Sequence, residues 1–127
     1  MKVLVDTSVW IDHFRRSNPH LGQLLVDGHV VHHSAVIGEL ACGTLRERDR
    51  VLQDLQRLPG LPRPRDEEAL YLVERHRLWG RGLGWTDVLL LASCQLTGVD
   101  LWTRDRALNS AALELGLAYA LPRPGSR

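Results

Sequence analysis

Cysteine, lysine and long apolar runs are all scarce in this chain. Cys42 and Cys94 are the only cysteines in 127 residues, and neither lies in metal-ligand spacing with another cysteine or a histidine. We therefore expect two buried, reduced thiols and no structural zinc. The longest apolar run, residues 88–92, is far shorter than the roughly 18 residues that span a bilayer, and residues 2–5 fit a strand better than a signal peptide. These absences predict a cytoplasmic protein with no membrane association.

The charges of the chain nearly balance. Lys2 is the only lysine among 16 basic residues, and the net charge is +1. A charge this small does not by itself indicate a nucleic-acid partner. A genome rich in arginine codons explains the arginines more simply than a need for phosphate-binding groups. The glycine-rich segment 80–84 lacks the GxxxxGK[ST] pattern of a phosphate-binding loop, so we interpret it as a flexible loop beside a site.

Segments with strand and helix periodicity alternate along the chain. The size suits one domain, residues 1–121, followed by a frayed tail at residues 122–127. Strands that are joined through helices form parallel sheets, so we predict an α/β protein. The expected strands are 2–5, 29–34, 99–103 and 117–120, with a very short edge strand within 59–64; the expected helices are 9–14, 20–27, 35–43, 45–58, 66–79, 85–97 and 108–115.

Four acidic residues stand where these elements begin or end. Asp6 and Asp105 follow directly after two predicted strands. Glu39 interrupts an apolar helix, and Asp87 lies in the first turn of the helix over 85–97. Each acid alone is explained as well by helix capping or solvation as by chemistry. Because the carboxyl ends of parallel strands share one edge of a sheet, we expect the four carboxylates to lie together there.

Crowded carboxylates favour a bound cation. They repel and raise one another's pKa unless positive charge neutralises them. Ligand sets made only of oxygen suit Mg²⁺ or Mn²⁺ better than zinc. A pair of such ions about 3.5–4 Å apart can activate a water and stabilise both oxygens of an in-line phosphoryl displacement. The acids therefore predict metal-dependent hydrolysis of a phosphodiester.

Four short blocks of sequence resemble those of a known family. They are Val-Asp-Thr-Ser-Val-Trp-Ile-Asp at 5–12, Gly-Glu-Leu at 38–40, Thr-Asp-Val-Leu-Leu-Leu-Ala at 86–92 and Trp-Thr-Arg-Asp-Arg-Ala-Leu at 102–108. In this order and spacing they resemble the signature blocks of PIN-domain ribonucleases, and the size is similar to that of the VapC toxins of toxin–antitoxin pairs. Gly38 stands where members often have a small hydroxyl residue, and Leu108 where an aromatic is common. Neither departure removes an acid.

The resemblance implies a single PIN domain, a three-layer α/β/α sandwich with a mostly parallel sheet of about five strands. It also implies an endoribonuclease that hydrolyses RNA with Mg²⁺ or Mn²⁺. A homodimer is expected, as is a toxin–antitoxin hetero-oligomer. In the family a VapB-type antitoxin wraps and inhibits the toxin, and it can push an arginine into the acidic pocket.

The family's catalytic, metal-binding positions are occupied here by Asp6, Glu39, Asp87 and Asp105. We expect the two acids at strand ends to bind metal directly and the other two to complete the coordination or hold metal-bound waters. The accompanying hydroxyl positions hold Thr7, Ser8 and Thr103. These hydroxyls either orient carboxylates or only cap the local backbone, and both interpretations stay open.

Arginines near the acidic edge are candidates for contacts with RNA phosphates. Ordinary solvation explains any single one of them as well. Asp12 fits a surface acid of the first helix better than a ligand. The candidate arginines are Arg15, Arg16, Arg81, Arg104 and Arg106.

Three other functions also fit parts of the pattern. A phosphoacceptor receiver domain gathers acids around Mg²⁺ as well, but it needs a lysine near the site, and Lys2 is at the wrong end of its strand. A non-catalytic PIN module would bind RNA or protein without cleaving anything. A PIN nuclease in RNA processing would act without an antitoxin.

Overall fold

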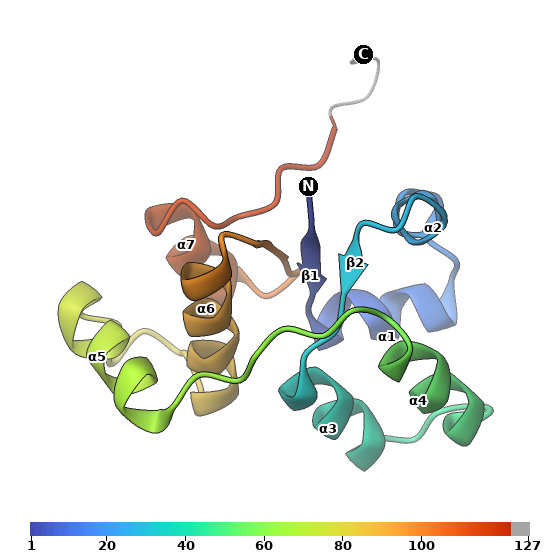
Figure 1. Cartoon of the computed structure of the whole chain (residues 1–127), viewed down its shortest axis with the longest axis horizontal. Coiled ribbons are helices and arrows are strands. Elements are labelled where there is room, and N and C mark those ends of the chain that lie inside the picture. The colour runs from blue at the N-terminus through green and yellow to red at the C-terminus, as the bar shows by residue number, and fades with distance from the viewer. Residues whose placement is uncertain (123–127) are drawn as a thin grey trace.

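A small parallel sheet forms the centre of the protein, which we describe from a computed structural model over residues 1–122 (Figure 1). Its strands are β1 (Val3–Val5), β2 (Val30–Val31) and β3 (Asp100–Trp102), in the order β2-β1-β3. Val3 pairs with Val30 on one side and with Asp100 on the other. The predicted parallel α/β fold is confirmed. Of the predicted tail, residues 123–127 lie outside the described part of the chain.

The described chain has three regular strands where about five were expected. The other two predicted segments make one parallel bridge each, Gly60 beside His32 and Ala118 beside Leu101. His32 donates its N–H to the carbonyl of Pro59 at 2.8 Å and accepts from the N–H of Leu61 at 2.9 Å. Prolines at 59 and 62 have no N–H, so the segment cannot form further bonds of this kind at those positions. These edge segments widen the sheet without forming strands.

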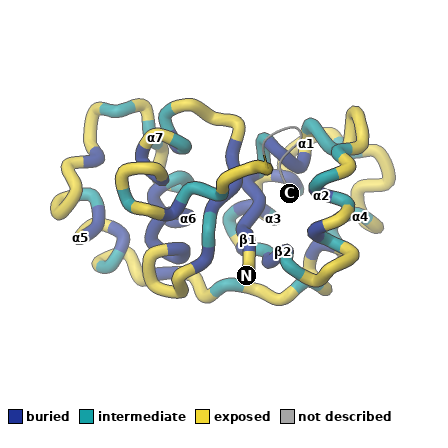
Figure 2. The backbone as a smooth tube through the Cα atoms, turned by 90° about the horizontal axis from the view of Figure 1, so that it is seen from above, coloured by how far each residue is buried: buried dark blue, intermediate teal, exposed yellow. Residues whose placement is uncertain are grey.

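Seven helices flank the strands in the described chain. Figures 1 and 2 place α5, α6 and α7 on one side of β1 and the other four helices on the other side, which gives the expected three layers. Asn18 caps α2 with its side chain, which accepts from the N–H of Leu21 at 3.1 Å. The helices are α1 (Thr7–Arg15), α2 (Pro19–Val26), α3 (Ser34–Cys42), α4 (Arg48–Gln56), α5 (Asp66–His76), α6 (Trp85–Thr97) and α7 (Arg106–Glu114).

The core is built from β1 and α6. All three residues of β1 are fully buried, and every residue of α6 from Val88 to Cys94 is buried, as its continuous apolar run predicts (Figure 2). Cys94 is a buried thiol as expected, whereas Cys42 is exposed, because it ends α3 where the chain leaves for the surface. No helix of the described residues is long and apolar enough to cross a membrane.

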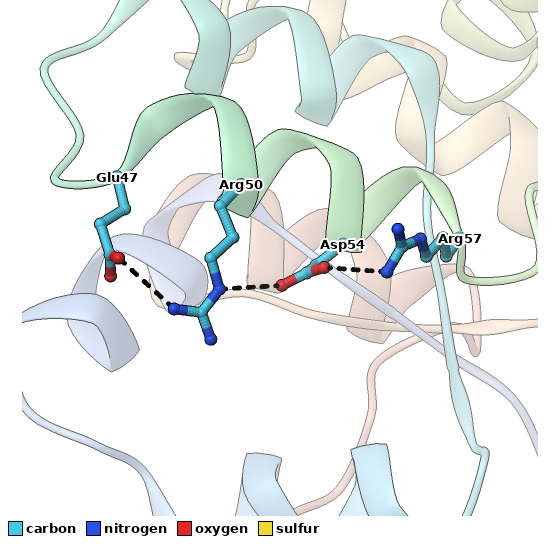
Figure 3. A network of polar contacts seen from close by, with 4 residues as sticks. All are labelled: Glu47, Arg50, Asp54 and Arg57. Atoms are coloured by element: carbon cyan, nitrogen blue, oxygen red, sulfur yellow. Dashed lines mark hydrogen bonds and ion pairs between the residues drawn. The ribbon is translucent and has the colours of Figure 1, made fainter.

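Helix α4 begins later than the sequence indicates and carries a solvated charged face. The chain starts it at Arg48 because Glu47 adopts a left-handed backbone with φ of 51°. Figure 3 shows a row of ion pairs along its surface, from Glu47 to Arg50 (3.4 Å), on to Asp54 (3.9 Å) and then to Arg57 (3.5 Å). All four side chains are more than half exposed, so each pair adds little to stability. This face needs no functional explanation.

A buried histidine joins the two layers of helices to the sheet. The side chain of His33 is fully buried, and its Nδ1 accepts from the N–H of Ala35 at 3.0 Å, which caps α3. Nε2 therefore carries the proton and donates to Ser93 Oγ at 2.8 Å, and that hydroxyl donates to the carbonyl of Pro62 at 3.0 Å. Burial, helped by the charge of Arg63, lowers the pKa of His33 from 6.5 to about 4.

This histidine makes stability depend on pH. Between pH 6.5 and about 4, His33 is protonated in the unfolded chain but stays neutral in the folded protein, so acid favours unfolding. We expect His33 to lower the free energy of unfolding by about 2 kcal/mol between about pH 7.5 and about pH 5. Urea unfolding at both pH values measures this against His33→Asn, which keeps a capping side chain but does not titrate. Equal losses in the two proteins would contradict the assignment.

Candidate active site

Asp6 is the most firmly held acid of the predicted set. It follows β1 directly, and its backbone N–H extends the sheet by donating to the carbonyl of Trp102 at 2.9 Å. Its side chain is 7% exposed, and Oδ2 accepts from Ser8 Oγ at 2.8 Å and from Thr103 Oγ1 at 2.7 Å. Two hydroxyl donors stabilise the ionised carboxylate and fix its orientation.

The same two hydroxyls connect the ends of β1 and β3. Ser8 Oγ accepts from the N–H of Arg104 at 3.0 Å, and Thr103 Oγ1 accepts from the N–H of Asp105 at 3.0 Å. Both hydroxyls therefore use their proton on Asp6 and their lone pairs on the backbone that leads to Asp105. The sequence left open whether Ser8 and Thr103 orient carboxylates or only cap the backbone. Their hydrogen bonds to Asp6 favour the orienting role. The third hydroxyl, Thr7, makes only a long contact of 3.4 Å with Glu39.

The remaining acids reach the same edge from three helices. Asp105 caps α7, with Oδ1 accepting from the N–H of Leu108 at 3.0 Å. Asp87 accepts at Oδ2 from the N–H of Gly84 at 2.9 Å, in the first turn of α6. Glu39 is exposed on α3. Capping is thus real for both aspartates, and it occupies one carboxylate oxygen of each.

In the described chain, each of the four carboxylates has one oxygen without a hydrogen-bond partner. The free atoms are Oδ1 of Asp6, Oε2 of Glu39, Oδ1 of Asp87 and Oδ2 of Asp105. Each acid is therefore oriented by the protein through one oxygen and can still act as a ligand through the other.

The pKa values of two of the four acids, Glu39 and Asp87, are raised by the charges of their neighbours. Partial burial is the main reason why the pKa of Glu39 is raised, and the charge of Asp6 raises it further. Asp87 adds to this effect, whereas the Thr7 hydroxyl opposes it. Burial is also the main reason why the pKa of Asp87 is raised, and the charges of Asp6 and Asp105 raise it further. The hydrogen bond from the N–H of Gly84 acts in the opposite direction and lowers this pKa. No arginine, lysine or histidine of residues 1–122 forms an ion pair with any of the four.

The donor chemistry fits a hard divalent cation, although the carboxylates do not converge on one point. Within residues 1–122, no three His, Cys, Asp or Glu side chains lie close enough together to hold a metal ion as they stand. Mg²⁺ usually keeps several waters and takes only one or two protein carboxylates directly. A site of separated carboxylates, each with a free oxygen and no neutralising cation, is compatible with that mode of binding.

Two of the five candidate arginines are paired with acids that the sequence did not single out. The guanidinium of Arg81 makes two bonds to Glu114, of 2.8 and 2.9 Å. Arg104 forms an ion pair of 2.6 Å with Asp12, and both side chains stay exposed, in line with the prediction that Asp12 is a surface acid. Within the described residues the other three have no carboxylate within 4 Å: Arg15, Arg16 and Arg106. All five arginines stay predicted contacts with RNA.

Comparison with known proteins places the chain in a family. Residues 3–113 match the PIN domain. The chain therefore belongs to the PIN-domain family. It is 49% identical over 119 residues to proteins named Ribonuclease VapC32 from two strains of Mycobacterium tuberculosis, CDC 1551 / Oshkosh and ATCC 25618 / H37Rv, and the match covers 93% of this chain and 96% of each relative. The crystal structure of PAE2754 from Pyrobaculum aerophilum has the same fold, with a TM-score of 0.59, 18% identity, and coverage of 91% of this chain and 90% of that one.

Proposed function

We propose that the chain is a metal-dependent endoribonuclease and the toxin of a VapBC-type toxin–antitoxin pair. The observation that carries the proposal is the group of four carboxylates at the carboxyl edge of a parallel sheet, none of which has a cationic partner among residues 1–122. The neighbouring acids raise the pKa of two of them, Glu39 and Asp87. The ribonuclease name of relatives at 49% identity supports RNA as the substrate. The proposed catalytic and metal-binding residues are Asp6, Glu39, Asp87 and Asp105.

The protein's own part in the reaction is to position oxygens and phosphate. When bound, Mg²⁺ or Mn²⁺ supplies an activated water and stabilises the oxygens that gain negative charge as the P–O bond breaks. Ser8 and Thr103 hold Asp6 with one oxygen turned to the site, and the N–H of Leu108 holds Asp105 in the same way. Arg104 and Arg106 flank Asp105 and are the candidates for binding the RNA backbone.

We further propose an antitoxin partner and a homodimer, as the resemblance implies. A groove of about 840 Å³ lies beside Glu39 between α1, α3 and the start of α4, and its walls include Ile11, Phe14 and Val51. An apolar segment of an antitoxin bound there would cover Glu39, which lines the groove. The cytoplasmic location expected from the reduced cysteines stays a prediction.

The test is cleavage of total RNA by the purified chain without antitoxin. With Mg²⁺ or Mn²⁺ we expect discrete fragments, because a PIN active site on a fixed scaffold selects particular bonds. A chelator should abolish cleavage, since the four carboxylates cannot activate a water alone, and an excess of Mn²⁺ should restore it. Folded chain that binds divalent ions yet cuts nothing would instead indicate a non-catalytic PIN module.

A further inference from the structure

Two of the four tryptophans are exposed, and one lies within a loop while the other directly follows it. Trp10 and Trp102 belong to the core and are 4% and 5% exposed. Trp79 and Trp85, at 58% and 42% exposed, stand near the two ends of the loop 77–84 that joins α5 to α6. Neither makes a ring contact with another aromatic side chain in the described chain. Large apolar rings left in water beside a candidate active site suggest a flat, apolar ligand.

The loop that carries these rings is fixed to the rest of the fold. Arg81, near its middle, is held to Glu114 at the end of α7 by the two bonds of 2.8 and 2.9 Å. Leu78 is 2% exposed and anchors the segment in the core next to Trp79. The rings are therefore presented on a backbone that is already ordered, which lowers the entropy lost when a ligand binds.

The charge around the rings suits an anionic ligand. The twelve residues from 75 to 86 contain three arginines and one histidine and no acidic residue. Arg81 is neutralised by Glu114, but Arg75 and Arg77 are exposed, and no carboxylate of residues 1–122 lies within 4 Å of either guanidinium. Exposed rings among arginines are the pattern with which proteins bind unpaired nucleic acid, the rings stacking on bases and the cations following phosphates.

The position of Trp85 decides which nucleotide it can contact. It is the first residue of α6, and Asp87 is the third. Side chains two positions apart on a helix point about 200° apart. Trp85 therefore does not point the same way as Asp87, so a base stacked on it would belong to a nucleotide flanking the bond that is cut.

We propose that Trp79 and Trp85 form a stacking platform for unpaired bases of single-stranded RNA next to the cleavage site. This rests on the proposed ribonuclease function and adds a preference to it. Bases inside a duplex are stacked on each other and cannot use the platform, so the enzyme should select single-stranded segments or loops.

The test uses the Asp6→Asn chain with Mg²⁺, so that RNA is bound without being cut. The probe is an unstructured RNA oligonucleotide with a 5′ fluorescein label, alone or annealed to its complement. By fluorescence anisotropy we expect the single strand to bind at least about tenfold more tightly than the duplex, and Trp79→Leu or Trp85→Leu to weaken it about tenfold each. Unlabelled RNA should quench indole emission less in either variant, and Trp85→Phe should retain part of the affinity.

Tyr71→Leu is the matched control, because Tyr71 is an aromatic residue on α5 that is 67% exposed and lies outside the loop 77–84. It should leave both readouts unchanged. Unchanged affinity and quenching in both Leu variants would overturn the platform and assign the exposed rings to a protein partner, while cleavage by the native chain would still stand. No RNA binding together with no cleavage by the native chain would overturn the proposed function and the platform with it.

Discussion

Asp6→Asn is expected to reduce RNA cleavage by about a thousandfold while the protein stays folded, because the change removes a negative charge that would hold the divalent ion of the reaction. The amide has the same shape as the carboxylate, and its oxygen can still accept from the hydroxyls of Ser8 and Thr103, which now hold Oδ2. The charge also contributes to the raised pKa of Glu39 and of Asp87. Both pKa values should therefore fall toward their ordinary range in the variant without metal, a change that NMR titration can follow.

Asp27→Asn is the control for this experiment. Asp27 follows α2, before β2, so it lies toward the opposite edge of the sheet, and its carboxylate contacts only the side chain of Gln23, at 3.0 Å, among the side-chain hydrogen bonds of residues 1–122. The same loss of one negative charge there should leave cleavage and both pKa values unchanged. Cleavage by Asp6→Asn within tenfold of the native rate would remove Asp6 from the catalytic set.

The sequence predicts the fold well where one segment determines its own environment. The continuous apolar run of α6 indicates burial on all sides, and residues 88–94 are all buried. The alternation of strands and helices predicts a parallel sheet, and that rule in turn places the ends of β1 and β3 at one edge. How far the sheet extends beyond its three strands is not predictable in this way. Gly60 and Ala118 pair only through single bridges, which depend on how neighbouring loops pack.

The site is predicted less completely than the fold. Residue type and position after a strand mark Asp6 and Asp105 as candidates, and the set of four acids together with the family resemblance favours catalysis over capping. The partners of the arginines come from elsewhere in the chain: Glu114 for Arg81 and Asp12 for Arg104. Such pairs leave no period in the sequence, so only the folded arrangement can identify them. The exposure of Trp85 is not predictable from the sequence either, because it depends on which elements pack beside the start of α6.

Thr103→Val should have a large combined effect, because one hydroxyl serves two acids. Thr103 is 9% exposed, donates to Asp6 at 2.7 Å and accepts from the N–H of Asp105 at 3.0 Å. Valine has nearly the same shape but leaves that N–H without its partner and takes one of two donors from Asp6. We expect the free energy of unfolding to fall by about 2 kcal/mol and cleavage to fall about 10- to 100-fold, as when other groups that orient a metal ligand are removed.

Thr103→Ser separates the hydroxyl from the rest of the side chain. Serine keeps both hydrogen bonds and loses only a methyl group, so cleavage should remain within a few-fold of the native rate and stability should fall by about 1 kcal/mol. Urea unfolding and cleavage rates of the two variants, measured side by side, decide the matter. If the two variants cleaved RNA equally and differed only in stability, the hydroxyl would only cap the local backbone. If serine alone kept activity, the hydrogen bond from the hydroxyl at position 103 to Asp6 would be what orients the carboxylate for catalysis.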